Sequence, residues 1–324
     1  MTESVFATIA GHREIVARLR QALALGRPGH AWLFHGPEGI GKRAVAMAWI
    51  QSLFCAQPVR DGTGVAGCGV CLSCRKCVEG NHPDLRILTV EEKKSRISVE
   101  QVRDLTRFMA FTPMESAWKA AIIDDAAWMN DAAANALLKT LEEPPPGSLL
   151  ILITERPGAL LPTIRSRCLK ERFQLLEVES LTPLLARLAP ESTPEERALA
   201  VEVAGGSIGA ALRWCDEKSL EHRLRFFHEL DTLGKRSLSE LIEMAQIWSE
   251  AERFVLVPEL LETWFARRIR EGVADGRGDE VEAWLEGAAA ALRLVRELKI
   301  FNLNPRLTLE AIFIRLARMQ GVTC

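Results

Sequence analysis

The stretch Ala31-Trp-Leu-Phe-His-Gly-Pro-Glu-Gly-Ile-Gly-Lys42 decides the fold of this 324-residue chain. Its first five residues form a short apolar run that predicts a buried strand, and an alanine-rich run to about Leu53 predicts a helix. Between them lies the pattern Gly-x-x-x-x-Gly-Lys, in which backbone N–H groups hold phosphates and the lysine meets their charge. A glycine turn that binds no nucleotide would fit the same residues. We predict a phosphate loop made by Gly36, Gly39, Gly41 and Lys42.

Two departures from the usual pattern argue against efficient ATP hydrolysis. The position after Lys42 normally holds a Ser or Thr whose hydroxyl binds magnesium, but here it is Arg43, which cannot ligate a cation. A second apolar strand, starting at Lys119, ends in Asp124 and Asp125, where P-loop ATPases of this class usually carry Asp-Glu. The water-polarising carboxylate would therefore be one methylene shorter. The alternative is that these two acids are simply exposed to water at the end of the strand and have no catalytic role.

Strand and helix patterns alternate through the first half of the chain. Ser98 and Gln101 have capping-box spacing at the start of one helix, and the apolar stripe of a second helix ends at Leu141. A third apolar strand covers 149–154. This alternation predicts an α/β fold with a parallel sheet covered on both faces, whose site lies at the carboxyl ends of the strands. After about Phe173 the pattern is helical, with breaks at 205–206, 272–278 and 302–305.

Five cysteines cluster between residues 55 and 77, in a glycine-rich segment that we expect to be an irregular insertion. Their spacing predicts a metal site, and four thiolates would fill the tetrahedral sphere of a structural zinc ion. From spacing alone Cys77 could replace Cys55 as a ligand. Iron–sulfur ligation and free thiols are the other interpretations. The sequence favours zinc, with Cys55, Cys68, Cys71, Cys74 and Cys77 as candidates.

Composition excludes several classes of protein. Hydrophobic residues make up 48% and charged residues 26%, and the net charge is −2, so neither disorder nor independent binding to duplex DNA is indicated. No apolar run reaches the roughly 18 residues of a membrane span, and the first eight residues lack the pattern of a secretory signal. We expect a cytoplasmic protein in which the cysteines form no disulfide framework.

Several further motifs resemble the clamp-loader branch of the AAA+ proteins, and within it the δ′ family of bacterial DNA polymerase III. The resemblance covers the first 175 residues and reappears near the C-terminus. The motifs are His30-Ala-Trp-Leu-Phe34, Asn81-His-Pro-Asp84, Ile97-Ser-Val-Glu-Gln-Val-Arg103, Asn135-Ala-Leu-Leu-Lys-Thr-Leu-Glu-Glu-Pro-Pro145, Thr163-Ile-Arg-Ser-Arg-Cys168 and Asn302-Leu-Asn-Pro-Arg-Leu-Thr-Leu-Glu310.

The resemblance assigns roles to individual residues. Thr154 matches the polar sensor near the γ-phosphate, and Arg167 matches an arginine finger that reaches the ATP of a neighbouring subunit. Gly209 stands where ATP-hydrolysing relatives carry a second sensor arginine. Groups that serve the chain's own site are thus lost while the group that acts in trans is kept, which favours δ′ over the γ/τ motor subunit. The family's zinc module corresponds to Cys55, Cys68, Cys71 and Cys74.

The resemblance also implies an architecture and partners. We expect a RecA-like AAA+ domain at 1–174 with a zinc module at about 55–77, a small helical lid at 175–216, and an all-α collar domain at 217–324. The γ/τ and δ subunits would be direct partners, and the sliding clamp and primed DNA would be reached through the assembled complex.

Three activities are consistent with these patterns. The first is a subunit of the DNA-directed DNA polymerase holoenzyme that hydrolyses no ATP alone and need not bind ATP and magnesium. A γ/τ-like ATPase that tolerates Arg43 and a P-loop nucleotide kinase are the alternatives.

Overall fold

The computed structural model describes residues 4–91, 96–215, 217–301 and 303–321. The chain forms two compact units, one of residues 1–190 with 205–210 and the other of residues 191–204 with 211–324. The finer division into three domains at residues 174 and 216 stays a prediction.

The first unit contains a parallel sheet with the strand order β4-β5-β6-β1-β7. Its strands are β1 (Ala31–His35), β4 (Leu85–Leu88), β5 (Lys119–Ile123), β6 (Ser148–Thr154) and β7 (Leu169–Arg172). The three predicted strands are confirmed as β1, β5 and β6. The edge strands β4 and β7 were missed because each has only four residues and includes charged ones, so neither forms an apolar run.

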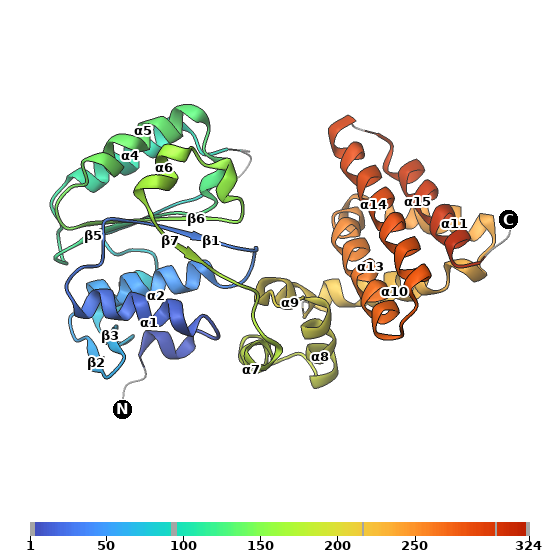
Figure 1. Cartoon of the computed structure of the whole chain (residues 1–324), viewed down its shortest axis with the longest axis horizontal. Helices are drawn as coiled ribbons and strands as arrows, with labels where there is room; N and C mark the ends of the chain where they lie inside the picture. The colour runs from blue at the N-terminus through green and yellow to red at the C-terminus, as the bar shows by residue number, and fades with distance from the viewer. Residues whose placement is uncertain (1–3, 92–95, 216, 302, 322–324) are drawn as a thin grey trace. The chain divides into compact units, whose positions relative to one another are not determined.

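Helices cover both faces of this sheet, as predicted. α1 (Arg13–Ala24) and α2 (Lys42–Phe54) lie on one face, and α4 (Val99–Ala110), α5 (Asp131–Glu142) and α6 (Pro162–Arg167) lie on the other (Figure 1). Successive residues of β1 point into different cores: Trp32 and Phe34 pack with α1 and α2, whereas Leu33 packs with α4 and α5. Because both faces are buried, the central strands β1, β5 and β6 are apolar except at their ends.

Short elements connect the sheet to these helices. Ser98 caps α4 in the predicted capping box with Gln101. Three 3₁₀ turns, η1 (Val5–Thr8), η2 (Ala126–Trp128) and η3 (Pro157–Ala159), and the helix α7 (Val178–Leu188) also belong to this unit.

The cysteine segment is more regular than expected. It contains a two-stranded antiparallel hairpin of β2 (Val59–Asp61) and β3 (Gly64–Ala66), followed by the helix α3 (Leu72–Val78). The expectation that this segment is irregular was therefore wrong, while its being an insertion stays a prediction. The strands have three residues each and the helix seven, which is too short for a hydrophobic period to be visible in sequence.

All the regular elements that the structure describes in the second unit are helices, which confirms the prediction for the chain after Phe173. α8 (Pro194–Val203) belongs to this unit, and α9 (Ile208–Trp214) begins in the first unit and ends in the second. The remaining elements are α10 (Glu217–Asp231), η4 (Leu233–Lys235), α11 (Leu238–Trp248), α12 (Ala251–Phe254), α13 (Val257–Ala274), α14 (Gly278–Phe301) and α15 (Pro305–Met319). Asn302, at one predicted break, lies outside the described residues.

Buried tryptophans dominate the core of the second unit. The indole N–H of Trp248 donates to Glu229 at 2.6 Å, and that of Trp264 donates to Asp231 at 2.7 Å. Both acceptors lie on α10, and Asp231 also binds Arg267 and Arg268. These two buried indoles therefore have hydrogen-bond partners, which removes the cost of burying their polar N–H groups.

Candidate functional site

The predicted phosphate loop connects β1 to α2 at the carboxyl end of the sheet. β6 lies beside β1, with Thr154 opposite His35, so the loop begins next to the end of β6. Gly36 has a φ of 147°, and a Cβ there would lie 2.3 Å from the carbonyl oxygen of Phe173. Only glycine fits this close approach. The loop therefore has the strand–glycine–helix context that phosphate binding requires.

Lys42 is turned toward the loop itself. Its ammonium donates to the carbonyl oxygens of Gly36 at 2.8 Å and Pro37 at 2.5 Å, and the residue is 8% exposed. Burial lowers the pKa of Lys42, while the nearby carboxylates of Glu155 and Asp124 oppose this effect. The lysine thus donates to loop carbonyls the same N–H groups that a bound phosphate would need.

Arg43 lies next to Asp124, the first acid after β5. Its terminal nitrogen Nη1 is 3.3 Å from the Asp124 Oδ2 atom. In a magnesium-binding loop a hydroxyl would follow the lysine, and the aspartate would hold the cation through water. Here the Arg43 guanidinium contacts Asp124, so the positive charge beside this aspartate comes from a side chain of the protein.

Asp125 is an exposed residue with left-handed backbone, at a φ of 56°. Asp and Asn adopt this conformation more readily than longer side chains, which gives a structural reason for aspartate here. Desolvation, together with the charges of Asp124 and Glu155, raises the pKa of Asp125. The predicted sensor Thr154 is 1% exposed, and its hydroxyl accepts a hydrogen bond from the Arg156 backbone at 3.0 Å.

The segment 205–210 packs directly on the phosphate loop within the first unit. The backbone N–H of Gly209 donates to the Gly39 carbonyl at 2.8 Å, and the Ser207 hydroxyl donates to the Glu38 carbonyl at 3.0 Å. A Cβ at Gly209 would lie 2.9 Å from the Gly39 Cα atom. Glycine at position 209 therefore permits a backbone-to-backbone contact where a sensor arginine could not be placed without displacing the loop.

A histidine that sequence analysis did not single out also fixes the loop. His12 Nε2 lies 2.8 Å from the Ile40 carbonyl oxygen, and the imidazole ring packs edge-on against Phe173. Burial lowers the pKa of His12, and the charge of Lys42 adds to this effect. The Gly11-His12 pair carries no recognisable motif, so only the folded chain reveals this contact.

Arg167 is the last residue of α6. One terminal nitrogen, Nη2, contacts Glu142 Oε1 at 2.8 Å, and the other, Nη1, donates to the Thr163 carbonyl at 3.0 Å. The Arg167 side chain is 36% exposed. It is distant in sequence from the phosphate loop, and its hydrogen bonds are to α5 and α6.

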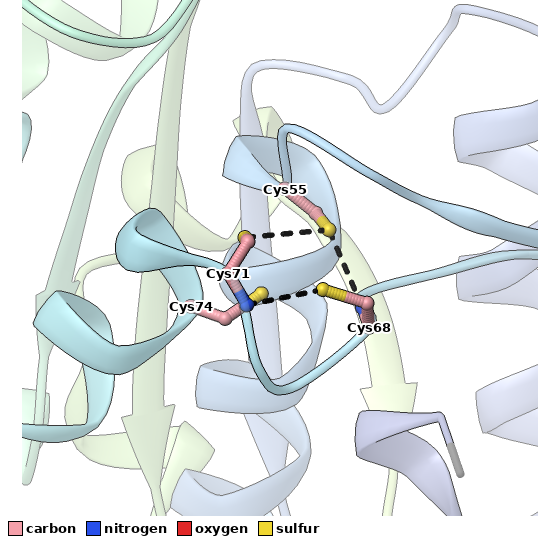
Figure 2. Close-up of side chains that lie close together, drawn as sticks. All are labelled: Cys55, Cys68, Cys71 and Cys74. Carbon is pink, nitrogen blue, oxygen red and sulfur yellow. Dashed lines mark hydrogen bonds between the residues drawn. The ribbon is translucent and has the colours of Figure 1, made fainter. Parts of the chain in front are cut away.

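Four of the five clustered cysteines converge on one point (Figure 2). Their sulfur atoms all lie within 4.8 Å of one another, and those of Cys55 and Cys71 are 3.8 Å apart. A zinc ion with bonds of about 2.3 Å to four sulfurs requires a tetrahedron with edges of about 3.8 Å. The arrangement therefore fits a tetrahedral thiolate site made by Cys55, Cys68, Cys71 and Cys74.

The environments of the thiols differ. Burial would raise the pKa of Cys71, but hydrogen bonds from the backbone N–H groups of Cys74 and Ala56 lower it to about 6. Burial raises the pKa of Cys55 and of Cys74. Cys77 lies outside the group, fully buried in the apolar core, where burial raises its pKa to about 12. An inert, protonated thiol is expected there.

The motif Asn81-His-Pro-Asp84 joins the cysteine module to the sheet. His82 Nε2 lies 3.0 Å from the Ser73 hydroxyl on α3. The fully buried Asp84 carboxylate accepts hydrogen bonds from the backbone N–H groups of residues 114, 115 and 116 at 2.7–2.9 Å, and it contacts the Lys119 ammonium at 3.3 Å. The motif was noted only as part of a family resemblance, and the fold reveals its structural role.

Comparison with known proteins adds independent evidence. The family model described as DNA polymerase III, delta subunit matches residues 11–177. DNA polymerase III subunit delta′ from Pseudomonas aeruginosa is 37% identical over 73% of this chain and 69% of its own length. DNA polymerase III subunit tau from Escherichia coli is 34% identical over 65% of this chain, which spans only 32% of that longer protein.

A solved structure supports the fold. A DNA polymerase III gamma subunit-related protein from Thermotoga maritima matches 96% of this chain and 100% of its own, with a TM-score of 0.50 and 20% identity. At this identity the likeness bears on the fold alone. Within the described ranges, every helix is too short or too polar to span a bilayer.

Proposed function

The chain belongs to the DNA polymerase III delta′ subunit family, and from this membership we propose how it works in the clamp loader. The first unit has the RecA-like AAA+ fold, and the relatives are subunits of one replication machine. We propose that this subunit hydrolyses no ATP itself and supports a neighbour that does. The assembled complex would use that ATP to load a sliding clamp onto primed DNA.

The contact between Arg43 and Asp124 carries the first half of this proposal. It places a guanidinium where a hydrolysing site needs magnesium, and a bound cation is the main charge that offsets the phosphates. Lys42 is engaged with loop carbonyls, and Gly209 lies against Gly39. The Arg43 and Lys42 contacts would have to break before a nucleotide and its metal could use Asp124 and the lysine.

Arg167 carries the second half. It lies at the end of a short helix and is partly exposed, as a residue that reaches into another subunit must be. An arginine finger neutralises charge that develops on the transferred phosphoryl group and accelerates hydrolysis roughly 10³- to 10⁵-fold. One side chain would then be enough to make the loader's ATPase depend on this subunit.

The cysteine group would hold a structural zinc ion. Four thiolates fill the coordination sphere of zinc and leave no position for a substrate water. When bound, the ion would tie the end of α2 to α3 through Cys55 and Cys74. The proposed partners are γ/τ and δ subunits in the cytoplasm.

A steady-state ATPase assay on the purified chain tests the proposal. We expect a rate no higher than background, with and without DNA and clamp. A turnover of about 1 s⁻¹, which is ordinary for enzymes, would instead favour a γ/τ-like ATPase. That alternative remains relevant because tau subunits are among the relatives.

A further inference from the structure

The backbone of Arg167 is fixed by its neighbours in sequence. Ile164, one turn earlier, is fully buried, and Cys168, the next residue, is 8% exposed. Both belong to the apolar core that also contains Leu137 and Leu141 of α5. α6 is therefore anchored against α5, and the two helices lie on the same face of the sheet (Figure 1).

The side chain of Arg167 is held as well. Each terminal nitrogen has one partner: Glu142 Oε1 for Nη2 at 2.8 Å and the Thr163 carbonyl for Nη1 at 3.0 Å. Thr163 lies on the same helix as Arg167, but Glu142 is the last residue of α5. The Glu142 contact thus fixes the guanidinium relative to a second element, and it orders a side chain that would otherwise sample many rotamers.

We infer that Glu142 is a positioning residue for the arginine finger: its carboxylate holds the Arg167 guanidinium in place before the neighbour's nucleotide arrives. This inference rests on the proposed function of Arg167. Catalysis gains when a group that stabilises the transition state is already oriented. The pair is half exposed, with Glu142 at 49%, so the bond is weak enough for phosphate oxygens to compete for the same nitrogen.

The opposite role for Glu142 is a restraint. Its negative charge could hold Arg167 back from phosphate, in which case its removal would speed hydrolysis. The two roles therefore predict changes of opposite sign, and a substitution can separate them. Glu142 is suited to this test because it is half exposed at a helix end, where substitution spares the core.

The experiment uses Glu142→Ala and Glu142→Asp in a loader reconstituted from all its subunits. The aspartate keeps the charge but is one methylene too short to keep the 2.8 Å contact. We expect both variants to lower the DNA- and clamp-stimulated kcat for ATP about two- to fivefold, with KM for ATP unchanged. Glu143→Gln, which removes the adjacent exposed carboxylate, is the matched control and should keep the wild-type rate.

A second measurement reports on the finger directly. In the isolated subunit, the Nε–Hε NMR signal of Arg167 should show faster internal motion than in wild type in both Glu142 variants. The Glu143→Gln control should show the same motion as wild type. In an Arg167→Ala background, Glu142→Ala should have no further effect on kcat. If the Glu142 variants keep or raise kcat while Arg167→Ala lowers it, the positioning role of Glu142 is overturned and the proposed role of Arg167 stands. Wild-type rates for Arg167→Ala itself would overturn both.

Discussion

At the scale of single residues, Arg43 shows how one substitution changes the chemistry of a phosphate loop. Its guanidinium contacts Asp124 at 3.3 Å, on the side of the loop where a hydroxyl and a magnesium ion would otherwise be expected. Lys42, which retains the residue type of the motif, donates to two loop carbonyls. A residue that matches a motif can therefore serve the loop's own structure.

Replacing Lys42 tests this interpretation. We expect Lys42→Ala to leave clamp loading by the reconstituted complex nearly unchanged, because no transferred phosphate depends on this ammonium. The measurement is the rate of clamp loading onto primed DNA. The corresponding lysine of an ATP-hydrolysing subunit in the same complex serves as the positive control, since its loss should stop loading. A comparable loss with Lys42→Ala would mean that this loop binds a working nucleotide.

Asp84 is a second residue whose effect can be measured. Burial alone would raise its pKa, but three backbone N–H groups and Lys119 lower it. A carboxyl group with a lowered pKa stabilises the fold above its unfolded pKa of about 4, and this stability is lost as the pH falls toward the folded pKa. At neutral pH the full contribution is present.

We expect Asp84→Asn to lower the free energy of unfolding by about 3 kcal/mol, because it removes the charge from a buried, hydrogen-bonded pair. Urea unfolding should give the same difference from wild type between about pH 7 and pH 9. Asp104→Asn, at an exposed position on α4, should cost less than about 0.5 kcal/mol. A difference between wild type and Asp84→Asn that changes across this pH range would contradict the assignment.

At the scale of elements, the cysteine module is built from the ends of helices. Cys55 is the residue that follows α2, Cys71 precedes α3, and Cys74 lies in its first turn. α3 has seven residues, fewer than an isolated helix needs to be stable in water. Its stability must therefore come from the sulfur group at its start and from the core that buries Cys77.

Metal analysis of the purified protein should find about one zinc ion per chain. Cys55→Ser should lower this occupancy, because it removes one of the four converging sulfurs. Cys77→Ser should keep the metal while lowering stability, since a hydroxyl replaces a buried apolar thiol. Ligation stabilises small zinc modules by an apparent 10–16 kcal/mol or so, and chelation should therefore reduce the helical signal. Loss of zinc from Cys77→Ser alone would show that the ligand set is wrong.

At the scale of the whole molecule, the chain joins an α/β unit to a helical unit, each with its own buried core. The groups that would serve its own nucleotide are altered at positions 43, 125 and 209. Arg167 lies on a different part of the first unit and has hydrogen-bond partners on α5 and α6. On the proposed function, this arrangement would give the protein a role in ATP hydrolysis only within an oligomer.

Arg167→Ala should leave folding and complex assembly intact and slow ATP hydrolysis at a neighbouring subunit's site. The reason is electrostatic, because the guanidinium would no longer neutralise charge on the transferred phosphoryl group. Arg167→Lys should rescue only partly, since lysine lacks the planar fork. The measurements are the DNA- and clamp-stimulated ATPase rate and clamp loading by the reconstituted complex. Wild-type rates in both would leave this subunit as a scaffold.

The sequence by itself determined the central strands, the phosphate loop and the helical second half. These features depend on local periodicity and on glycine positions, which are readable without knowing what lies nearby. The edge strands and the hairpin of the cysteine segment were not readable, because three or four residues carry no period. Arg43 and Gly209 were recognised as departures, but the sequence could not show what replaces the missing groups.

Only the tertiary structure decided which distant residues meet. Spacing left Cys55 and Cys77 equivalent as candidate ligands, whereas the fold brings the Cys55 sulfur to those of Cys68, Cys71 and Cys74 and buries Cys77 in the core. The fold likewise brings Arg43 into contact with Asp124 and Arg167 into contact with Glu142. Each of these contacts joins two elements that are separate in sequence, and their distance depends on how the helices pack on the sheet, which no local pattern encodes.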